Sequence, residues 1–275
     1  MYIKRNLTAA KARFWISLKI YFRYPLKILQ VFIDPIIWLA PFYFMEKTFT
    51  PSGSLKGFEQ YSGNSDFMGF LVIGYMITAY INTTFWGLGY NLKDEMWQGV
   101  LESNWSAPVN RINLLVSRCS FDFVAVTVEN IITAVICHFL FGFTITPAIL
   151  KLLMFLIPGI IGMLGIGIAI ASLVLMAKEA NGIIDVSSSL ISGLSGSFFP
   201  IKVMPRALMM VSMALPLTFL NDSSRAILIG QGTILPLTSE FVIIFLSMFV
   251  LMFIGSFVFT NVERRCRTSG NLSGH

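Results

Sequence analysis

The sequence predicts an all-α membrane protein with six transmembrane helices, an N-terminal interfacial amphipathic helix and a re-entrant hairpin between the fifth and sixth spans. Of the 275 residues, 55% are hydrophobic and only 12% are charged, with a mean hydropathy of +0.74. A soluble domain carries roughly twice that share of charged residues. The apolar residues also gather in stretches near the length of about 20 residues that a helix needs to cross the hydrocarbon layer. A soluble globular enzyme is therefore excluded.

Six apolar stretches supply the predicted spans, which are in chain order 26–44, 67–90, 114–143, 152–176, 183–199 and 241–260. The fifth is barely long enough to cross. Residues 1–25 interleave Lys and Arg with large apolar side chains, which favours a helix along the membrane surface over an ordinary basic flank. Between the last two spans, 206–220 is bounded by prolines and too short to cross, so 200–239 is predicted as an external re-entrant region.

The positive charges predict the orientation, because Lys and Arg are retained on the cytoplasmic side. With the N-terminus inside, the outer side holds only Lys47, Lys56, Lys151, Lys202, Arg206 and Arg225 of the 20 Lys and Arg residues. We expect a multi-pass protein of the cell inner (plasma) membrane with both termini cytoplasmic. The net charge of +6 largely flanks the spans, where membrane lipids are the nearer partner, so no nucleic acid is expected.

No site for chemistry on this chain is apparent in the sequence. A phosphate-binding loop needs a glycine-rich turn followed by Lys, and the sequence contains no Gly-Lys dipeptide. The His-Glu-x-x-His and Gly-x-Ser-x-Gly patterns are also missing, and two His residues are too few for a metal site. We therefore expect no catalytic residue, no metal and no cofactor on this chain, and an energy source on a partner.

The segment 91–113 is the most informative cytosolic connection, because it mixes Asp94, Glu95 and Glu102 with Trp97 and Trp105. Such a segment is predicted either as a helix under the membrane whose acids face a protein partner, or as a solvated loop with interfacial tryptophans. Its composition favours neither alternative.

Two motifs resemble those of the ABC transporter type-2 permeases. The family's cytosolic motif has an acid, a few residues, Gly-Thr-Leu-Glu, then Ser/Thr-Pro-Val and a basic residue, and the matching positions are Glu95, Gly99, Leu101, Glu102, Pro108, Val109 and Arg111. The family's Gly-x-x-Phe-Pro, Leu-Pro, Leu-Pro-Leu-Thr and Arg pattern is similar to Gly196, Phe199, Pro200, Met204, Pro205, Leu215, Pro216, Leu217, Thr218 and Arg225. Val100 departs from the family's Thr, and Asn104 and Trp105 stand where aliphatic residues are common.

The resemblance implies that 1–275 is a single permease domain, the membrane-spanning subunit of an ATP-driven exporter. It implies that 91–113 is a coupling segment, whose residues Glu95, Gly99, Leu101, Glu102 and Pro108 couple to a cytosolic ATP-binding cassette ATPase that carries ATP and Mg. The external gate would comprise Phe199, Pro200, Pro205, Pro216 and Arg225. The working assembly would hold two ATPase subunits and a second permease chain, identical or sister, and move an amphipathic or lipid-linked substrate.

Charged and small residues within the spans indicate where helices or substrate meet. Asp122, Glu129 and Asp185 are candidates for a polar translocation path, because a charge inside the membrane is costly. The alternative is structural, with Asp122 paired to Arg118 one turn away and Glu129 sealing a helix contact. Small residues recur every fourth position in the fifth span, which favours a permease–permease interface at Ser192, Gly193 and Gly196.

A proton-coupled secondary transporter is the rival function, with Asp122, Glu129 and Asp185 carrying the proton. Many such carriers contain internal repeats that pair their two halves. No such repeat is evident in this sequence, which weighs against this class.

Overall fold

The computed structural model describes residues 2–49, 56–106, 110–144 and 146–268, and within these ranges every regular element is a helix. In chain order the elements are α1 (Tyr2–Arg23), α2 (Pro25–Phe49), α3 (Lys56–Ser62), α4 (Phe67–Phe85), the π-helical η1 (Trp86–Tyr90), α5 (Asn91–Trp97), α6 (Leu101–Ser106), α7 (Arg111–Phe141), α8 (Ile149–Ala177), α9 (Asn181–Leu194), the 3-10 turn η2 (Ile201–Val203), α10 (Arg206–Ala214), α11 (Pro216–Ile229) and α12 (Leu237–Thr268). This confirms the all-α prediction.

Five of these helices are long and apolar enough to cross a membrane. They are α2, the continuous helix Phe67–Trp97 formed by α4, η1 and α5, and the helices α7, α8 and α12. The predicted fifth span behaves differently, because α9 has 14 residues and ends at Leu194 instead of continuing to residue 199. The chain turns there because Gly196 takes a left-handed conformation with φ 73°, which side chains with a Cβ rarely adopt.

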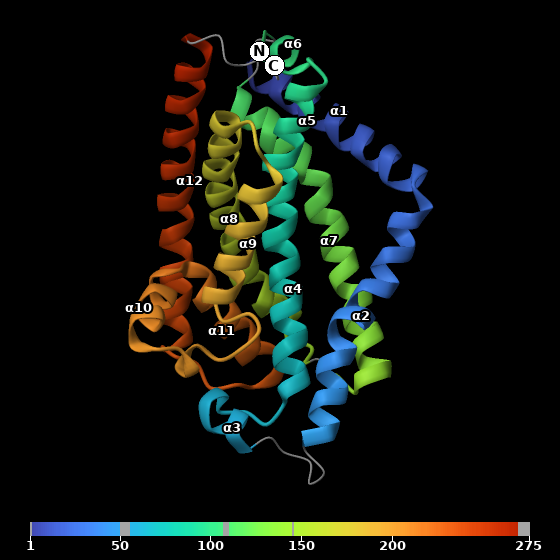
Figure 1. Cartoon of the computed structure of the whole chain (residues 1–275), viewed down its shortest axis with the longest axis vertical. Helices are drawn as coiled ribbons and strands as arrows, with labels where there is room; N and C mark the ends of the chain where they lie inside the picture. The colour runs from blue at the N-terminus through green and yellow to red at the C-terminus, as the bar shows by residue number, and fades with distance from the viewer. Residues whose placement is uncertain (1, 50–55, 107–109, 145, 269–275) are drawn as a thin grey trace.

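The long helices run side by side, with α4 and α8 near the centre and α12 on one flank (Figure 1). On the other flank, α1 and α2 meet at Tyr24 and form an angled arm, which we call the α1–α2 arm, and this arm packs mainly along α7. The beginning of α1 and the end of α12 lie at the same end of the bundle as α5 and α6, whereas α3 and α10 lie towards the opposite end (Figure 1). We call these the α5–α6 end and the α10 end.

Glycines let α8 and α12 cross with their backbones in contact. The backbone carbonyl of Gly165 lies directly against Gly255, and a methyl group at Gly165 would overlap the Leu251 carbonyl. Gly159 accommodates the Leu220 side chain of α11 in the same manner. Close approach at small residues is the usual way in which membrane helices associate, because lipid tails offer them no hydrophobic contrast. Gly159 and Gly165 of α8 therefore serve helix packing.

Gly165→Ala is expected to destabilise the folded protein by about 1–3 kcal/mol, because the added methyl must push the α12 backbone away. Gly162→Ala is the matched control on the same helix, since its methyl would find Leu251 at an ordinary contact distance of 3.5 Å. Thermal unfolding in detergent measures both. Equal melting temperatures for the two variants would contradict the crossing.

Candidate functional site

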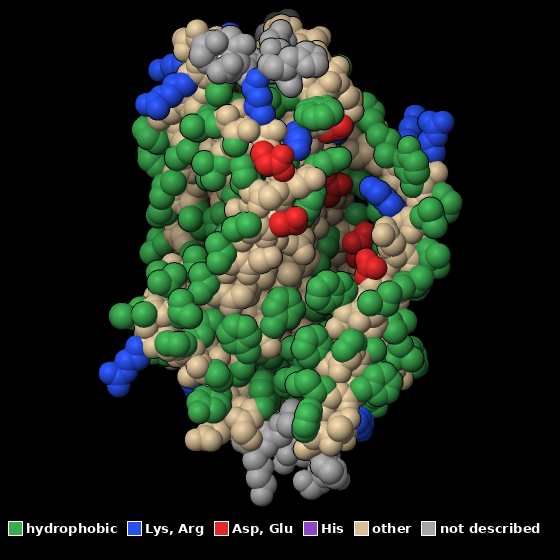
Figure 2. Space-filling model, viewed as in Figure 1, with side chains coloured by type: hydrophobic (Ala, Val, Ile, Leu, Met, Phe, Trp, Pro, Cys, Tyr) green, Lys and Arg blue, Asp and Glu red, His purple; other side chains and the backbone are tan. Residues whose placement is uncertain are grey.

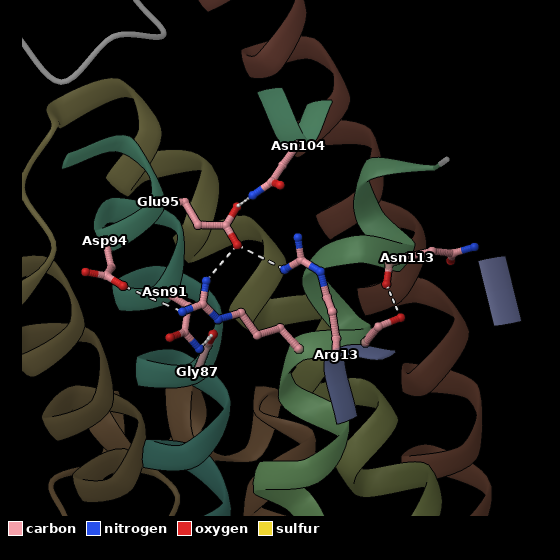
Figure 3. Close-up of polar contacts among 9 residues, drawn as sticks. Arg13, Gly87, Asn91, Asp94, Glu95, Asn104 and Asn113 are labelled. Carbon is pink, nitrogen blue, oxygen red and sulfur yellow. Dashed lines mark hydrogen bonds and ion pairs between the residues drawn. The ribbon is translucent and has the colours of Figure 1, made fainter. Parts of the chain in front are cut away.

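A buried carboxylate ties three helices together at the α5–α6 end. Glu95 on α5 is only 5% exposed. Its Oε1 accepts hydrogen bonds from Arg118 of α7 at 2.6 Å and from Arg13 of α1 at 3.0 Å. Its Oε2 accepts from the Asn104 amide of α6 at 3.3 Å. Figure 3 shows Glu95 and Asn104 pointing toward one another above Arg13. We call these four residues the Glu95 cluster.

The local sequence explains why α5 and α6 fold onto the bundle. Gly99 takes φ 67° and turns the chain between the two short helices. Leu101 and Trp105 of α6 then enter a core that includes residues of α7, α8 and α12. The Trp105 ring meets the Phe259 ring of α12 edge to face, with 6.2 Å between their centroids. The segment is therefore a structured platform, which favours the helix alternative over a solvated loop.

Two further ion pairs fasten the α5–α6 end of the bundle. Arg111 at the start of α7 pairs with Glu263 of α12 at 2.6 Å. Lys93 of α5 pairs with the exposed Glu179, which precedes α9, at 3.4 Å. A hydrogen bond from the Gly182 backbone and the neighbouring Lys93 lower the pKa of Glu179, so this carboxylate stays charged. The ends of α5, α7, α9 and α12 are thereby linked by charge.

The structure changes the roles expected of the coupling residues. Glu95 was expected to face a partner, but its carboxylate points into the chain, because two guanidinium groups hold it there. Leu101 is also buried, and Gly99 forms the exposed turn. The Glu102 side chain and Pro108 lie outside the described residues. The exposed part of the platform instead includes Trp97, which is 74% exposed, and Val100.

A cavity of about 760 Å³ lies between the α1–α2 arm, the helix of α4–η1–α5, and α7. Figure 2 shows acidic side chains inside the hollow beside this arm. On α7 the lining residues share one helical face and are Arg118, Asp122, Ala125, Glu129 and Thr133. Arg13, Glu95 and Asn104 of the Glu95 cluster line the same cavity. One continuous hollow thus reaches from the α5–α6 platform along the inner faces of α2, α4 and α7.

The three intramembrane acids separate into two groups. Asp122 and Glu129 both line the cavity, and Glu129 accepts a hydrogen bond from the Tyr21 hydroxyl of α1 at 3.0 Å. Asp185 lies on an exposed face of α9 and is not among the cavity's described lining residues. The expected pairing of Asp122 with Arg118 is wrong within the described chain, since Arg118 binds Glu95 and, at 3.6 Å, Asp94. Asp122 is left facing the cavity.

A π-helical turn shapes the wall opposite Asp122. In η1 the helix widens over Trp86–Tyr90, and the Asn91 amide donates to the Gly87 carbonyl at 2.6 Å. Trp86, Gly87 and Asn91 all line the cavity. Such turns are rare and often occur at functional sites.

The residues of the second motif surround a buried arginine on α11. Arg225 of α11 is 3% exposed, and its guanidinium donates to the Gly196 carbonyl at 2.9 Å, the Ser197 carbonyl at 2.8 Å and the Phe70 carbonyl at 3.3 Å. It also lies 3.4 Å from the centre of the Phe70 ring. Gly74 makes room for the Ser197 carbonyl beside it. Arg225 therefore joins α11 and the turn after α9 to α4.

The other residues of this motif shape the turns around α10. Pro216 is the first residue of α11, where proline is favoured, and Pro205 caps α10. Phe199 is exposed, and Pro200 precedes the η2 turn. Among contacts with the described residues, only Arg225 of the predicted gate set makes a polar network with neighbouring elements.

The predicted interface residues do not share one surface. Ser192 is buried within the chain, and Gly196 is held beside Ile201 by its own turn. Gly193 alone has open space where a side chain would project. The small residues of α9 form two separate faces. Ser188 and Ser192 face the interior of the chain, whereas Ser189 and Gly193 are more exposed.

Two important residues of α1 were not singled out by the sequence analysis as site residues. Arg13 and Tyr21 were assigned to a membrane-surface helix, but they reach Glu95 and Glu129. A usable signal existed, because Arg13, Ser17 and Tyr21 recur every fourth residue and therefore form a polar stripe that faces the cavity.

The five long apolar helices indicate a multi-pass membrane protein, and the polar cavity lies between the α1–α2 arm, the helix of α4–η1–α5, and α7. The ABC-2 type transporter family model matches residues 8–229, from α1 to the end of α11. The chain therefore belongs to the ABC-2 type transporter family and is a membrane subunit of an ABC transporter. This confirms the resemblance of its two motifs. A search among curated proteins gave no significant match.

Glu95→Ala is expected to destabilise the protein by about 2 kcal/mol, because two arginines lose a charged hydrogen-bond acceptor. Glu179→Ala removes an exposed partner of an ion pair and should change little. Unfolding in detergent, followed by tryptophan fluorescence, compares the two. A Glu95 variant as stable as the Glu179 variant would show that the Glu95 cluster does not hold the platform.

Proposed function

We propose that this chain is the membrane-spanning subunit of an ATP-driven exporter that moves an amphipathic or lipid-linked substrate through the 760 Å³ cavity. The observation that carries the proposal is the position of the Glu95 cluster. The same carboxylate that fixes the coupling platform also lines the cavity and binds the two helices, α1 and α7, that form its walls. A displacement of the platform must therefore change the cavity.

The proposed cycle starts at the exposed side of the platform. Trp97 and Val100 would bind a cytosolic ATP-binding cassette ATPase, which supplies ATP and Mg. As two ATPase subunits close on ATP, α5 moves, and Arg13 and Arg118 follow the Glu95 carboxylate. The α1–α2 arm and α7 then shift relative to one another. Two charged hydrogen bonds to one acceptor are strong enough to couple both helices to α5.

The topology that fits this proposal has six passes in the cell inner (plasma) membrane. Five are the long apolar helices, and the shorter α9 would supply the remaining pass. The α5–α6 end would face the cytosol with both termini. The helices α10 and α11 would form the external re-entrant hairpin, and α1 would lie at the inner surface, with its exposed Trp15 and Phe22 towards lipid.

At the outer end, Arg225 would hold the external gate. Its bonds to the carbonyls of Gly196, Ser197 and Phe70 close the turn after α9 against α4 in this structure. Release of these bonds would separate the two elements and open the outer side. The gate proposal concerns Arg225 with Phe199, Pro200, Pro205 and Pro216, which set the turns around it.

Trp97→Ala is expected to weaken binding of the ATPase at least about tenfold, because exposed tryptophans at interfaces commonly contribute about 2 kcal/mol or more. Trp38→Ala on α2 is the control, since Trp38 is also exposed but lies on a membrane span. Purification from native membranes in mild detergent measures the ATP-hydrolysing subunit recovered with each variant. Full recovery with the Trp97 variant would refute the assigned contact, and transport that persists without ATP would refute the function.

A second permease chain, identical or sister, would pair through the open face of α9. Gly193→Leu should reduce crosslinking between permease chains several-fold without disturbing the chain's own fold, because nothing lies within 4 Å of the position where its side chain begins. Gly57→Leu, which also enters open space, on α3, is the control. Unchanged crosslinking of the Gly193 variant would place the permease interface elsewhere.

A further inference from the structure

The cavity has the size of a ligand site and polar groups left without protein partners. Its volume of about 760 Å³ lies within the range of 300–1,000 Å³ that is usual for small-molecule pockets. Thr133 of α7 is 3% exposed and lines the cavity, yet its hydroxyl makes no hydrogen bond within the described part of the chain. Asp122 lies on the same face of α7, about three turns nearer the platform. It likewise makes no hydrogen bond or ion pair with a described residue. A ligand would satisfy both groups.

The charges of the cavity are unequal along its length. Near the platform, Arg13 and Arg118 are already neutralised by Glu95 and Asp94. Away from the platform, Asp34, Asp122 and Glu129 line the cavity together with Lys27. Arg118, one turn from Asp122, is also near this carboxylate, but Arg118 is already shared with Glu95 and Asp94, so the carboxylates outnumber the cations available to them. An excess of carboxylates in a partly desolvated hollow favours a positively charged ligand and opposes an anionic one.

The aromatic lining agrees with the charge. Tyr21, Tyr75 and Trp86 all line the same cavity. The faces of such rings attract cations, with tryptophan the strongest, and carboxylates beside aromatic rings add to that attraction. A neutral polyol would gain hydrogen bonds but no charge attraction from this combination, and a phosphate would be repelled by the three carboxylates.

A second hollow lies at the elbow of the α1–α2 arm. It has a volume of about 360 Å³ and is formed by Tyr24, Leu26, Leu29 and Ile33 together with Lys27 and Gln30, which also line the main cavity. Leu26, Leu29 and Ile33 are exposed, so this hollow is an apolar surface adjoining the polar cavity. The two hollows together match a ligand with a charged part and an apolar part.

We infer that the cavity binds a cationic amphiphile, with its positive group beside Asp122 and Glu129 and its apolar part along the elbow of the α1–α2 arm. The inference rests on the proposed function in that it identifies this cavity with the transport path. It narrows the substrate from amphipathic molecules in general to those with a positive charge.

Matched hydrophobic ions test the inference on the full-length chain in phosphatidylcholine nanodiscs. Tetraphenylphosphonium and tetraphenylborate have nearly the same size and shape but opposite charge. Equilibrium binding of each radiolabelled ion, displaced by an excess of the unlabelled ion and corrected for empty nanodiscs, measures the saturable site. Saturable binding is expected for the phosphonium cation and not for the borate anion.

The variants locate the site. Asp122→Asn with Glu129→Gln should weaken phosphonium binding at least about tenfold, a difference of about 1.4 kcal/mol. Asp122→Asn alone guards against misfolding, because Asp122 has no described partner to lose, and it should weaken binding several-fold. Glu59→Gln removes an exposed carboxylate on α3, outside the cavity, and should leave binding unchanged.

The cation-binding inference can be refuted without refuting the exporter function. Saturable borate binding of equal affinity, no saturable phosphonium binding, or unaltered phosphonium binding in the Asp122 and double variants would each overturn the inference. None of these outcomes involves ATP or an ATPase. Conversely, phosphonium binding as predicted, with no ATPase recovered and no ATP-dependent transport, would refute the proposed function while leaving the cavity's cation preference in place.

Discussion

A carboxylate removed from water must be compensated by charge, and this constraint organises the α5–α6 end of the molecule. Glu95 meets it with two arginines and an amide that come from three other helices. Losing one partner of such a buried group is costly, because the remaining charge keeps its desolvation penalty without its compensation. The polar contact of α1 with α5 therefore depends on a single side chain, whereas Tyr21 gives α1 a second polar contact with α7.

This dependence connects local packing to the cavity. Glu95 reaches the arginines only because α5 continues directly from α4 and η1, and because Gly99 folds α6 back so that Asn104 faces it. The arginines in turn belong to helices that form the cavity walls. Hydrophobic contacts such as Trp105 against Phe259 hold the platform to α12, whereas the polar contacts hold it to α1 and α7. The platform is thus anchored firmly on one side and through ions on the side that faces the cavity.

Sequence reasoning identified the long spans and the two family motifs because these features are local. Apolar length alone locates α2, α7, α8 and α12. The fold of the motifs depends on contacts between distant segments, and local sequence patterns do not predict such contacts. Glu95 was assigned to an outer surface because nothing in its neighbourhood reveals that Arg13, 82 residues earlier, reaches it. The early end of α9 escaped prediction for a similar reason, since Gly196 was read as a packing residue and its turn conformation is set by contacts with Ile201 and Arg225.

The helix of α4, η1 and α5 has a consequence that concerns both ends of the molecule. It is one unbroken helix over Phe67–Trp97, with Glu95 near its last turn and Phe70 and Gly74 near its first. Phe70 and Gly74 are the positions that meet Arg225 and the Ser197 carbonyl. This helix is held by ion pairs at one end and by Arg225 at the other, so a displacement of one end is transmitted to the other. The π-helical turn at Trp86–Tyr90, beside the cavity, is the place where this helix bends most easily. A displacement of either end would therefore bend the helix next to the position of a bound substrate.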